Sequence, residues 1–213
     1  IIATVLNEEG QEEYFTPTVE PGAIGGTPAG GLNFGASVNP VCIIDQPYQF
    51  DFYDGGGLDM AFLGLAQCDR YGNINVSKFG PKIAGCGGFI NITQNAKEVV
   101  FCGTFTAGGL KLEIADGKLK IVQEGKIKKF VKDVEQITFS GKLAKENKKK
   151  VKYVTERAVF ELKPEGLTLI EIAPGIDIER DILEQMEFKP LISNELKTMD
   201  EKIFKAEKMG LVL

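Results

Sequence analysis

Among the residues of this chain that could do chemistry, the carboxylate of Glu20 stands out by its surroundings. It follows segment 12–19, which predicts a short extended strand, and it precedes a Pro-Gly turn and the pair Gly25-Gly26. Glycines let a backbone and a ligand approach closely, and threonines and a proline rather than charges lead up to it, so this carboxylate could be partly desolvated. Glu20 is therefore a candidate functional group, with a solvated surface carboxylate as the plain alternative.

A second candidate is the glycine-rich loop 85–88, which leads into an expected helix start. Backbone N–H groups at the positive end of a helix dipole can bind a phosphate or a developing oxyanion. The loop is not a Walker A loop, because no Gly-Lys-Ser/Thr follows, and the G-x-G-x-x-G spacing of a Rossmann fingerprint is absent. Gly85, Gly87 and Gly88 are therefore candidate oxyanion contacts, although a glycine loop alone is weak evidence.

Three further segments carry weaker signals. The glycines 55–57 that follow Asp54 predict either a loop close to a ligand or a tight strand entry, and the second is slightly preferred. The Lys-rich stretch 142–152 predicts a solvated hairpin loop, with phosphate binding as the lesser alternative. The charged segment 177–181 predicts an exposed helix face with local charge pairs.

The chain contains no histidine. This excludes His-based acid–base catalysis, Ser-His and Cys-His nucleophile pairs, and zinc sites that need imidazole. The four cysteines, Cys42, Cys68, Cys86 and Cys102, form no C-x-x-C pair, so no metal site or redox motif is expected. Their apolar or glycine-rich surroundings predict buried free thiols, which suit a reducing cytoplasm.

Composition bounds the class of protein. Hydrophobic residues make up 43% and charged residues 26% of the 213 residues, which is typical of a globular protein. The 25 basic and 30 acidic residues give a net charge of −5, so nucleic acid and anionic membranes are poor candidate partners. No signal peptide or transmembrane span is evident. The length predicts one domain over 1–213, and the start at Ile1 rather than Met suggests a longer parent chain.

The elements that would position the candidate residues mix strands and helices without strict alternation. Short apolar runs bounded by glycine predict strands buried on both faces of a sheet, at 42–44, 58–66 and 99–102. Turn residues predict antiparallel hairpins over 110–122, around Asp116-Gly117, and over 153–172, and two helices are expected at 177–186 and 199–209. We therefore predict an α/β fold: an open sandwich of a mostly parallel or mixed sheet with flanking helices and an added antiparallel hairpin region.

Several of these stretches together resemble one family in their order along nearly the whole chain. They are VEPGAIGG at 19–26, GGLNFG at 30–35, FDFYDGGGLD at 50–59, NINVS at 73–77, GCGGFINI at 85–92, TERAVF at 155–160 and APGIDIERD at 173–181. The first is similar to the E-x-G-x-x-G signature of family I coenzyme A transferases. The full set resembles the acetate/propionate (acetoacetyl) CoA-transferase branch, specifically the second half of its chains.

The resemblance implies roles for particular residues. Glu20 opens the signature and would be the catalytic glutamate, whereas Gly25 and Gly26 and the glycines of the loop 85–88 would contact CoA or an oxyanion. The position after the glutamate is often Ser or Asn in the family, and here it is Pro21. Proline lacks a backbone donor and a side-chain hydroxyl, so a role for this position in orienting the carboxylate is in doubt, but the carboxylate itself is not.

The family also implies a reaction and its partners. CoA would pass from a short-chain acyl-CoA to a carboxylic acid through a glutamyl-CoA thioester on Glu20, with CoA as a substrate and no permanently bound cofactor. The family's other half would precede this one and supply much of the CoA surface, and the assembly is expected to be a homo-oligomer in the cytoplasm. Two alternatives stay open: an acyl-CoA hydrolase that uses the same glutamate, and a non-catalytic ligand-sensing domain, against which the retained Glu20 argues.

Overall fold

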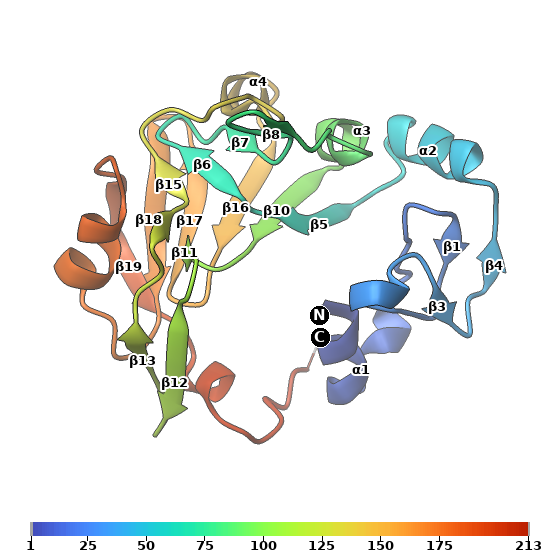
Figure 1. Cartoon of the computed structure of the whole chain (residues 1–213). Helices are drawn as coiled ribbons and strands as arrows, with labels where there is room; N and C mark the ends of the chain where they lie inside the picture. Colours follow the sequence, from blue (N-terminus) through green and yellow to red (C-terminus); the bar gives the residue numbers. More distant parts are fainter. Residues whose placement is uncertain (1, 213) are drawn as a thin grey trace. The chain divides into compact units, whose positions relative to one another are not determined.

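The computed structural model describes residues 2–212, which divide into two compact units (Figure 1). The small unit contains the residues up to 57 together with those from 206 onward, and the large unit spans Leu58–Lys205. The prediction of one domain within a longer parent stays a prediction. Within residues 2–212, no helix is both long and apolar enough to span a membrane.

The large unit is built on a six-stranded mixed sheet, which confirms the predicted α/β class (Figure 1). The strand order is β19-β18-β17-β16-β10-β5, with β5 parallel to β10, β10 to β16 and β18 to β19, and with β16, β17 and β18 antiparallel in succession. The bounds are β5 Met60–Gly64, β10 Glu98–Cys102, β16 Lys150–Val154, β17 Ala158–Lys163, β18 Gly166–Ile172 and β19 Leu191–Thr198. The predicted strands at 58–66 and 99–102 and the second hairpin are thus confirmed.

Shorter elements surround this sheet. A three-stranded sheet contains β6 (Gln67–Asp69), β7 (Ile74–Asn75) and β15 (Phe130–Val131). Pairs of strands are formed by β8 (Lys78–Phe79) with β9 (Lys82–Ile83), by β11 (Thr106–Ala107) with β14 (Ile127–Lys128), and by β12 (Lys111–Ala115) with β13 (Lys118–Gln123). The helical segments are α3 (Phe89–Asn95), α4 (Gly141–Glu146), a π-helix Ile178–Ile182 and 3₁₀ turns Leu183–Gln185 and Glu201–Phe204.

Aromatic rings fill the core on the sheet. Phe101 of β10 is fully buried and contacts three rings, with centroid distances of 5.7 Å to Phe89, 5.0 Å to Phe139 and 5.5 Å to Tyr153. Offset and edge-to-face contacts of this kind stabilise a core beyond the area that they bury. The apolar run 99–102 therefore lies in a central strand, and its Phe101 packs against aromatic rings from α3 and β16.

The hairpin of β12 and β13 follows the predicted turn chemistry. Ala115 pairs with Lys118 across a two-residue loop, and Asp116 and Gly117 both have positive φ, at 53° and 71°. This combination is the one that a type I′ turn requires, and Asp-Gly supplies it at low strain. The predicted hairpin at 110–122 is confirmed.

Several expectations in the large unit are wrong. The Lys-rich stretch 142–152 is not a hairpin loop: α4 covers its first part, with Ser140 as a side-chain cap, and β16 its last. Val151 and Tyr153 are buried at alternate positions of that strand, a two-residue period that the lysines between them obscure. The expected helix at 199–209 is only the turn Glu201–Phe204, and the helix at 177–186 is present but as π- and 3₁₀-segments.

Within its described residues, the small unit contains two α-helices and two short strand pairs. The helices are α1 (Ile2–Glu9) and α2 (Gln46–Asp54), the 3₁₀ turns are Glu12–Tyr14 and Gly31–Asn33, and the strands are β1 (Ala23–Ile24), β2 (Thr27–Pro28), β3 (Ser37–Val38) and β4 (Cys42–Ile43). β1 pairs with β4 and β2 with β3, both antiparallel. The Glu9 carboxylate accepts hydrogen bonds from the N–H groups of Met209 (2.7 Å), Gly210 (2.9 Å) and Leu211 (3.2 Å), which ties the last residues to α1.

Two expectations in the small unit are also wrong. The segment 12–19 contains a 3₁₀ turn at its start, and only Thr18 forms a bridge, to Ile24. The run 42–44 does form a strand, but Cys42 and Ile43 are exposed, because β4 pairs with β1 in a two-stranded ribbon rather than in a larger sheet. The cysteine prediction fails with it: Cys42 and Cys86 are exposed, Cys68 is buried and Cys102 is half-buried, although all four are free thiols as expected.

Candidate active site

Glu20 lies at the tip of a tight hairpin in the small unit. The Gly22 N–H donates to the Val19 carbonyl oxygen (2.9 Å) and the Val19 N–H donates to the Ala23 carbonyl oxygen (2.9 Å), so the chain reverses over Glu20 and Pro21. Val19 is buried, whereas Glu20 is half-buried. The turn therefore anchors its base in the unit and presents the carboxylate at its tip.

Gly22 allows β4 to lie directly against this turn. Its φ is +122°, and a Cβ at this position would lie 1.8 Å from the carbonyl oxygen of Ile44, where no atom fits. The Ile44 N–H in turn donates to the Gly22 carbonyl oxygen (3.0 Å), and Ala23 pairs with Ile43. The expectation that glycine beside Glu20 permits a close backbone approach is thus met at Gly22.

Gly25 and Gly26 serve a similar packing role. The Gly25 N–H donates to the Pro17 carbonyl oxygen (2.7 Å), and a Cβ on Gly25 would lie 2.6 Å from Cγ2 of Val41. A Cβ on Gly26 would lie 2.2 Å from the carbonyl oxygen of Val38. Both glycines let strands cross closely, and the Gly25 donor is already engaged within the unit. Their contact with CoA or an oxyanion stays a prediction.

A chain of buried hydrogen bonds lies behind the turn. The Tyr53 hydroxyl donates to Oγ1 of Thr18 (2.9 Å), and Nε2 of Gln49 donates to the Tyr53 hydroxyl (2.8 Å) and, at 3.4 Å, to the Val19 carbonyl oxygen. Gln49 is 0% and Tyr53 2% exposed. Both residues belong to α2, so this helix holds the two residues that precede Glu20.

Burial sets the electrostatics of this group. It raises the pKa of Glu20 above its usual value, so the carboxylate is more basic than one in water. Burial also raises the pKa of Tyr53, with a further contribution from the nearby negative charge of Glu20. The phenol therefore stays protonated beside the carboxylate, and a desolvated carboxylate is a better nucleophile than a solvated one.

The glycine loop 85–88 belongs to the large unit. Gly85 and Gly87 have positive φ, at 81° and 52°, and open space where a Cβ would stand. The Gly85 N–H donates to the Ser77 carbonyl oxygen (3.1 Å), which leaves it a poor oxyanion donor. Gly88 precedes α3, as the expected helix start indicated. Within the small unit, Glu20, Gly25 and Gly26 lie on one hairpin; the oxyanion role of Gly85, Gly87 and Gly88 stays a prediction.

The glycines 55–57 end α2. The Gly55 N–H donates to the Asp51 carbonyl oxygen (2.9 Å), and a Cβ on Gly57 would lie 2.2 Å from the Phe52 ring. The segment is thus a helix end packed on its own helix, and β5 begins only at Met60. The prediction of a tight strand entry is therefore wrong, and a contact of these glycines with a ligand stays a prediction.

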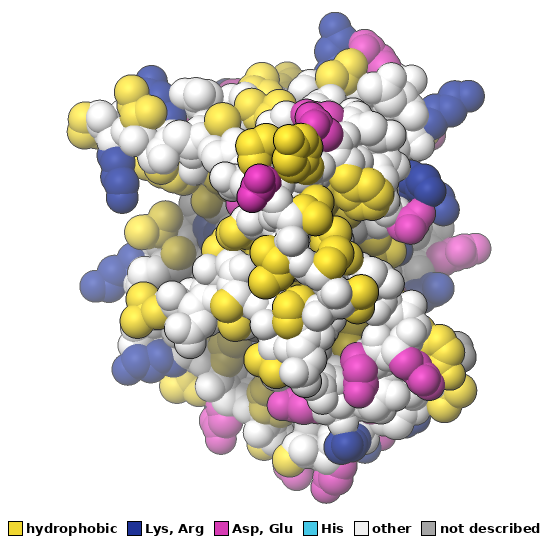
Figure 2. Space-filling view, turned by 90° about the vertical axis from the view of Figure 1, so that its right-hand side faces the viewer, with side chains coloured by type: hydrophobic (Ala, Val, Ile, Leu, Met, Phe, Trp, Pro, Cys, Tyr) yellow, Lys and Arg dark blue, Asp and Glu magenta, His cyan; other side chains and the backbone are white. Residues whose placement is uncertain are grey.

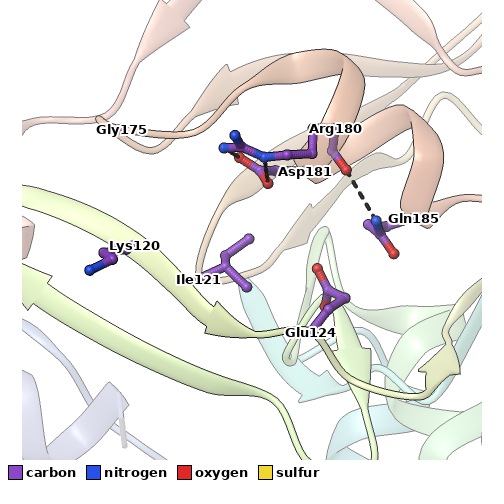
Figure 3. A pocket seen from close by; sticks show the side chains of 7 residues that line it. All are labelled: Lys120, Ile121, Glu124, Gly175, Arg180, Asp181 and Gln185. Carbon is purple, nitrogen blue, oxygen red and sulfur yellow. Dashed lines mark hydrogen bonds and ion pairs between the residues drawn. The ribbon is translucent and has the colours of Figure 1, made fainter.

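A polar cavity of about 450 Å³ occurs in the large unit (Figure 3). It is lined by Lys120, Ile121, Glu124, Gly175, Arg180, Asp181 and Gln185. Asp181 is buried and paired with Arg180 (2.7 Å), so the predicted exposed helix face at 177–181 is wrong for this residue. The fold turns Asp181 inward because its carboxylate also accepts the Asp177 N–H (2.9 Å).

Arg157 lies next to this cavity and is fully buried. Its guanidinium donates to Glu124 (2.6 Å) and Glu156 (2.7 Å) and to the carbonyl oxygen of Asp181 (3.1 Å). Burial alone would raise the pKa of Glu124, but the hydrogen bonds from Arg157 and Thr106 outweigh it and the pKa is lowered. These bonds connect the TERAVF stretch to Glu124 and to the backbone of Asp181. Within the described part of the chain, no three metal-ligating side chains of the His, Cys, Asp or Glu types cluster together.

The sequence pattern indicated Glu20 as a candidate but did not indicate the residues that hold its turn. Gln49 and Tyr53 stand four residues apart on α2, and Pro47 after Asp45 is a helix-start signal that could have indicated this helix. Gln49 contacts Val19, 30 residues earlier in the chain, and Tyr53 contacts Thr18, 35 residues earlier. No spacing rule predicts such a long-range contact.

Comparisons with known proteins identify related enzymes. No family model matches the chain. It is 56% identical over 212 residues to acetate CoA-transferase YdiF of Escherichia coli O157:H7, and 53% identical over 215 residues to a caffeate CoA-transferase of Acetobacterium woodii. These alignments cover 100% and 99% of this chain but only 40% and 41% of the relatives, so the chain spans about two fifths of their length.

Solved structures of coenzyme A transferases have the same fold as this chain. The crystal structure of YdiF in a thioester complex with CoA superposes with a TM-score of 0.93 at 55% identity, again over 100% of this chain and 40% of the other. A glutaconate CoA-transferase from Acidaminococcus fermentans, at 18% identity and a TM-score of 0.64, shares the fold. From its first described residue to its last, the chain is thus related to one portion of the coenzyme A transferases, as its residues indicated.

Proposed function

We propose that the full-length protein carrying this chain transfers CoA from a short-chain acyl-CoA to a carboxylic acid, with Glu20 as nucleophile and acyl carrier. One observation carries the proposal: a half-buried glutamate with a raised pKa stands at the tip of a hairpin held from behind by buried side chains. The similarity to acetate and caffeate CoA-transferases supports the same reaction class.

The first half of the reaction loads the enzyme. A Glu20 carboxylate oxygen attacks the thioester carbonyl carbon, a C–O bond forms, the C–S bond breaks, and CoA leaves as thiolate. The thiolate then attacks the Glu20 carbonyl carbon of the mixed anhydride. A C–S bond forms, the C–O bond to Glu20 breaks, and the first acid leaves as a carboxylate. The product is a glutamyl-CoA thioester on Glu20.

The second half reverses these steps with a new acid. Its carboxylate attacks the Glu20 thioester carbon and releases the thiolate, which then attacks the new acyl carbon and restores the free Glu20 carboxylate. Thioester replaces thioester, so the balance requires no ATP. Each attack creates a tetrahedral oxyanion, and a backbone donor such as Gly87 or Gly88 would stabilise it by about 2.7–4 kcal/mol.

The remaining part of the protein belongs to the proposal as well. Large apolar side chains of the small unit face solvent in this chain, namely Leu32, Phe34, Val38, Val41 and Ile43. Figure 2 shows hydrophobic side chains (yellow) gathered on the face that it presents. A patch of this kind marks an interaction surface. We assign it to the preceding half of the parent chain, in a cytoplasmic homo-oligomer without a permanently bound cofactor.

Trapping tests the proposal directly. Full-length protein is incubated with acetyl-CoA, reduced with borohydride and mapped by peptide mass spectrometry, with Glu20→Gln as the inactive variant and Glu13→Gln as the matched control at an exposed glutamate of the same unit. We expect the modification on the Glu20 peptide of the wild type and the control only. An unmodified Glu20 peptide in an active enzyme overturns the assignment.

The same preparation separates the alternatives. If CoA release is as fast without a second carboxylic acid as with one, the protein is an acyl-CoA hydrolase. If calorimetry detects CoA binding but neither release nor transfer occurs, it is a ligand-sensing domain.

A further inference from the structure

We propose that Gln49 and Tyr53 of α2 are positioning residues, which hold the turn that carries Glu20 in its reactive geometry. This inference rests on the proposed function, because it assigns how the nucleophile of that reaction is fixed. Neither side chain touches a reacting atom in the proposed steps. Both act through the backbone and side chain of the two residues that precede Glu20.

The geometry ties one face of α2 to the base of the turn. Residues four apart on a helix share a face, and from that face Tyr53 binds the hydroxyl of Thr18 while Gln49 binds the carbonyl of Val19. The bond between Gln49 and Tyr53 (2.8 Å) links the two contacts into one network. Thr18 and Val19 thus each receive a donor from α2, and the next residue is the nucleophile.

An unpaired atom gives an independent reason to assign a role to Gln49. Its Oε1 is fully buried and has no hydrogen-bond partner within the described residues, whereas its Nε2 has two. Buried polar atoms without a partner disfavour folding and call for an explanation. Methionine would fill the same length without such an atom. The unpaired Oε1 of Gln49 costs stability, and we explain the presence of glutamine here by the two hydrogen bonds that its Nε2 donates to Val19 and Tyr53.

The reaction needs this restraint twice in each half of the cycle. Glu20 first attacks as a carboxylate and is then attacked at its own carbonyl carbon, so two different approach directions must be met from one turn. Small displacements of a reacting group lower rates strongly even when substrate binding is unchanged. Loosening the base of the turn should therefore slow adduct formation more than it weakens the binding of acyl-CoA.

The test follows the rate at which the Glu20 adduct appears in the full-length enzyme after mixing with acetyl-CoA. The variants are Gln49→Met and Tyr53→Phe, and the matched control is Tyr48→Phe, the same chemical change at an exposed tyrosine of the same helix. We expect roughly a tenfold slower rate in both variants, about 1.4 kcal/mol in the barrier, with KM and the final adduct per chain as in the wild type. The melting temperature of Gln49→Met should change little, because removal of the unpaired buried oxygen offsets the loss of the two hydrogen bonds from Nε2.

The other outcomes decide against the inference. Wild-type rates in both variants overturn it. A lower final amount of adduct at an unchanged rate also overturns it, since that result indicates a loss of folded enzyme rather than of geometry. A wild-type enzyme that forms no Glu20 adduct overturns the proposed function, whereas a normal wild type with normal variants overturns only the positioning role.

Discussion

Replacement of Gly22 by alanine tests the geometry that presents Glu20. Glycine is required here for two separate reasons, its φ of +122° and the carbonyl oxygen of Ile44 only 1.8 Å from the place of a Cβ. Contacts of a Cβ below 3.0 Å are essentially never seen, so β4 must move by about 1 Å or more. The obstacle is backbone, which cannot rotate away as a side chain can.

The expected cost follows from what that movement breaks. An alanine at this φ carries backbone strain of about 1–3 kcal/mol. Displacing β4 also breaks the bond between the Ile44 N–H and the Gly22 carbonyl, about 1 kcal/mol net, and strains the pairing of Ala23 with Ile43. We expect the hairpin to lose about 3–5 kcal/mol of local stability, with a matching loss of Glu20 reactivity.

Hydrogen exchange of the full-length protein measures this loss where it occurs. The amides of Val19 and Val41 bond across the hairpin, to the carbonyls of Ala23 and Ile24. A loss of 3 kcal/mol should speed their exchange by about two orders of magnitude when local opening limits exchange.

Alanine substitutions at two other glycines of the small unit separate the effect of backbone strain from the effect of the clash with Ile44. Gly10 has a φ of +70° with open space around its Cβ position, so Gly10→Ala should show the strain alone. Gly30 has neither restriction, so Gly30→Ala should stay within about 0.5 kcal/mol of the wild type. If the exchange in Gly22→Ala matches that in Gly30→Ala, the close approach of β4 to the turn is refuted.

Three further predictions concern charge and thiols. Arg157→Met should lower the free energy of unfolding by about 3–5 kcal/mol in chemical denaturation, because the carboxylate of Glu124 loses its buried partner, and a change below 1 kcal/mol would contradict this. Because the pKa of Glu20 is raised in the folded protein, ionisation of this carboxyl opposes folding, so Glu20→Gln should become more stable than the wild type as pH rises above the pKa of Glu20 in the unfolded chain. The acid limb of the kcat/KM profile of the wild type should lie above pH 4.5 for the same reason. Equal dependence of stability on pH in the two proteins would refute the raised pKa. Cys86 should react with a thiol reagent in the native protein, whereas Cys68, buried and with a raised pKa, should react only on unfolding, as mass spectrometry of labelled peptides can show.

The sequence predicted those parts of the fold whose signals are local. Asp116-Gly117 indicates its turn because two positive φ angles in succession suit those residue types. The apolar run 99–102 indicates a buried strand, since each of its side chains is hydrophobic. The E-x-G-x-x-G pattern places a glutamate before a close backbone approach, and Gly22 shows that approach.

The predictions that are wrong, and the residues that were missed, depend on signals that are not local in the sequence. Val151 and Tyr153 face the core between lysines that extend to solvent, so charge conceals the strand period. Cys42 sits in an apolar run that is exposed, because burial depends on what covers a ribbon and not on its own residues. Gln49 was missed since its partners are set by tertiary packing. These are properties of contacts between distant segments, and no single window of sequence contains them.

Pro21 connects the site to the network behind it. Its ring nitrogen can donate no hydrogen bond, and its side chain has no polar atom to orient a carboxylate. What proline supplies is a fixed φ at the turn, which stiffens the reversal over Glu20. Position 21 therefore offers no polar group that could orient the Glu20 carboxylate. The side-chain groups that hold the turn come from α2: the Tyr53 hydroxyl, which donates to Thr18, and the Gln49 amide, which donates to Val19. If this division of roles is right, a serine in place of Pro21 should recover part of the rate that Tyr53→Phe loses, because it returns a donor beside the carboxylate.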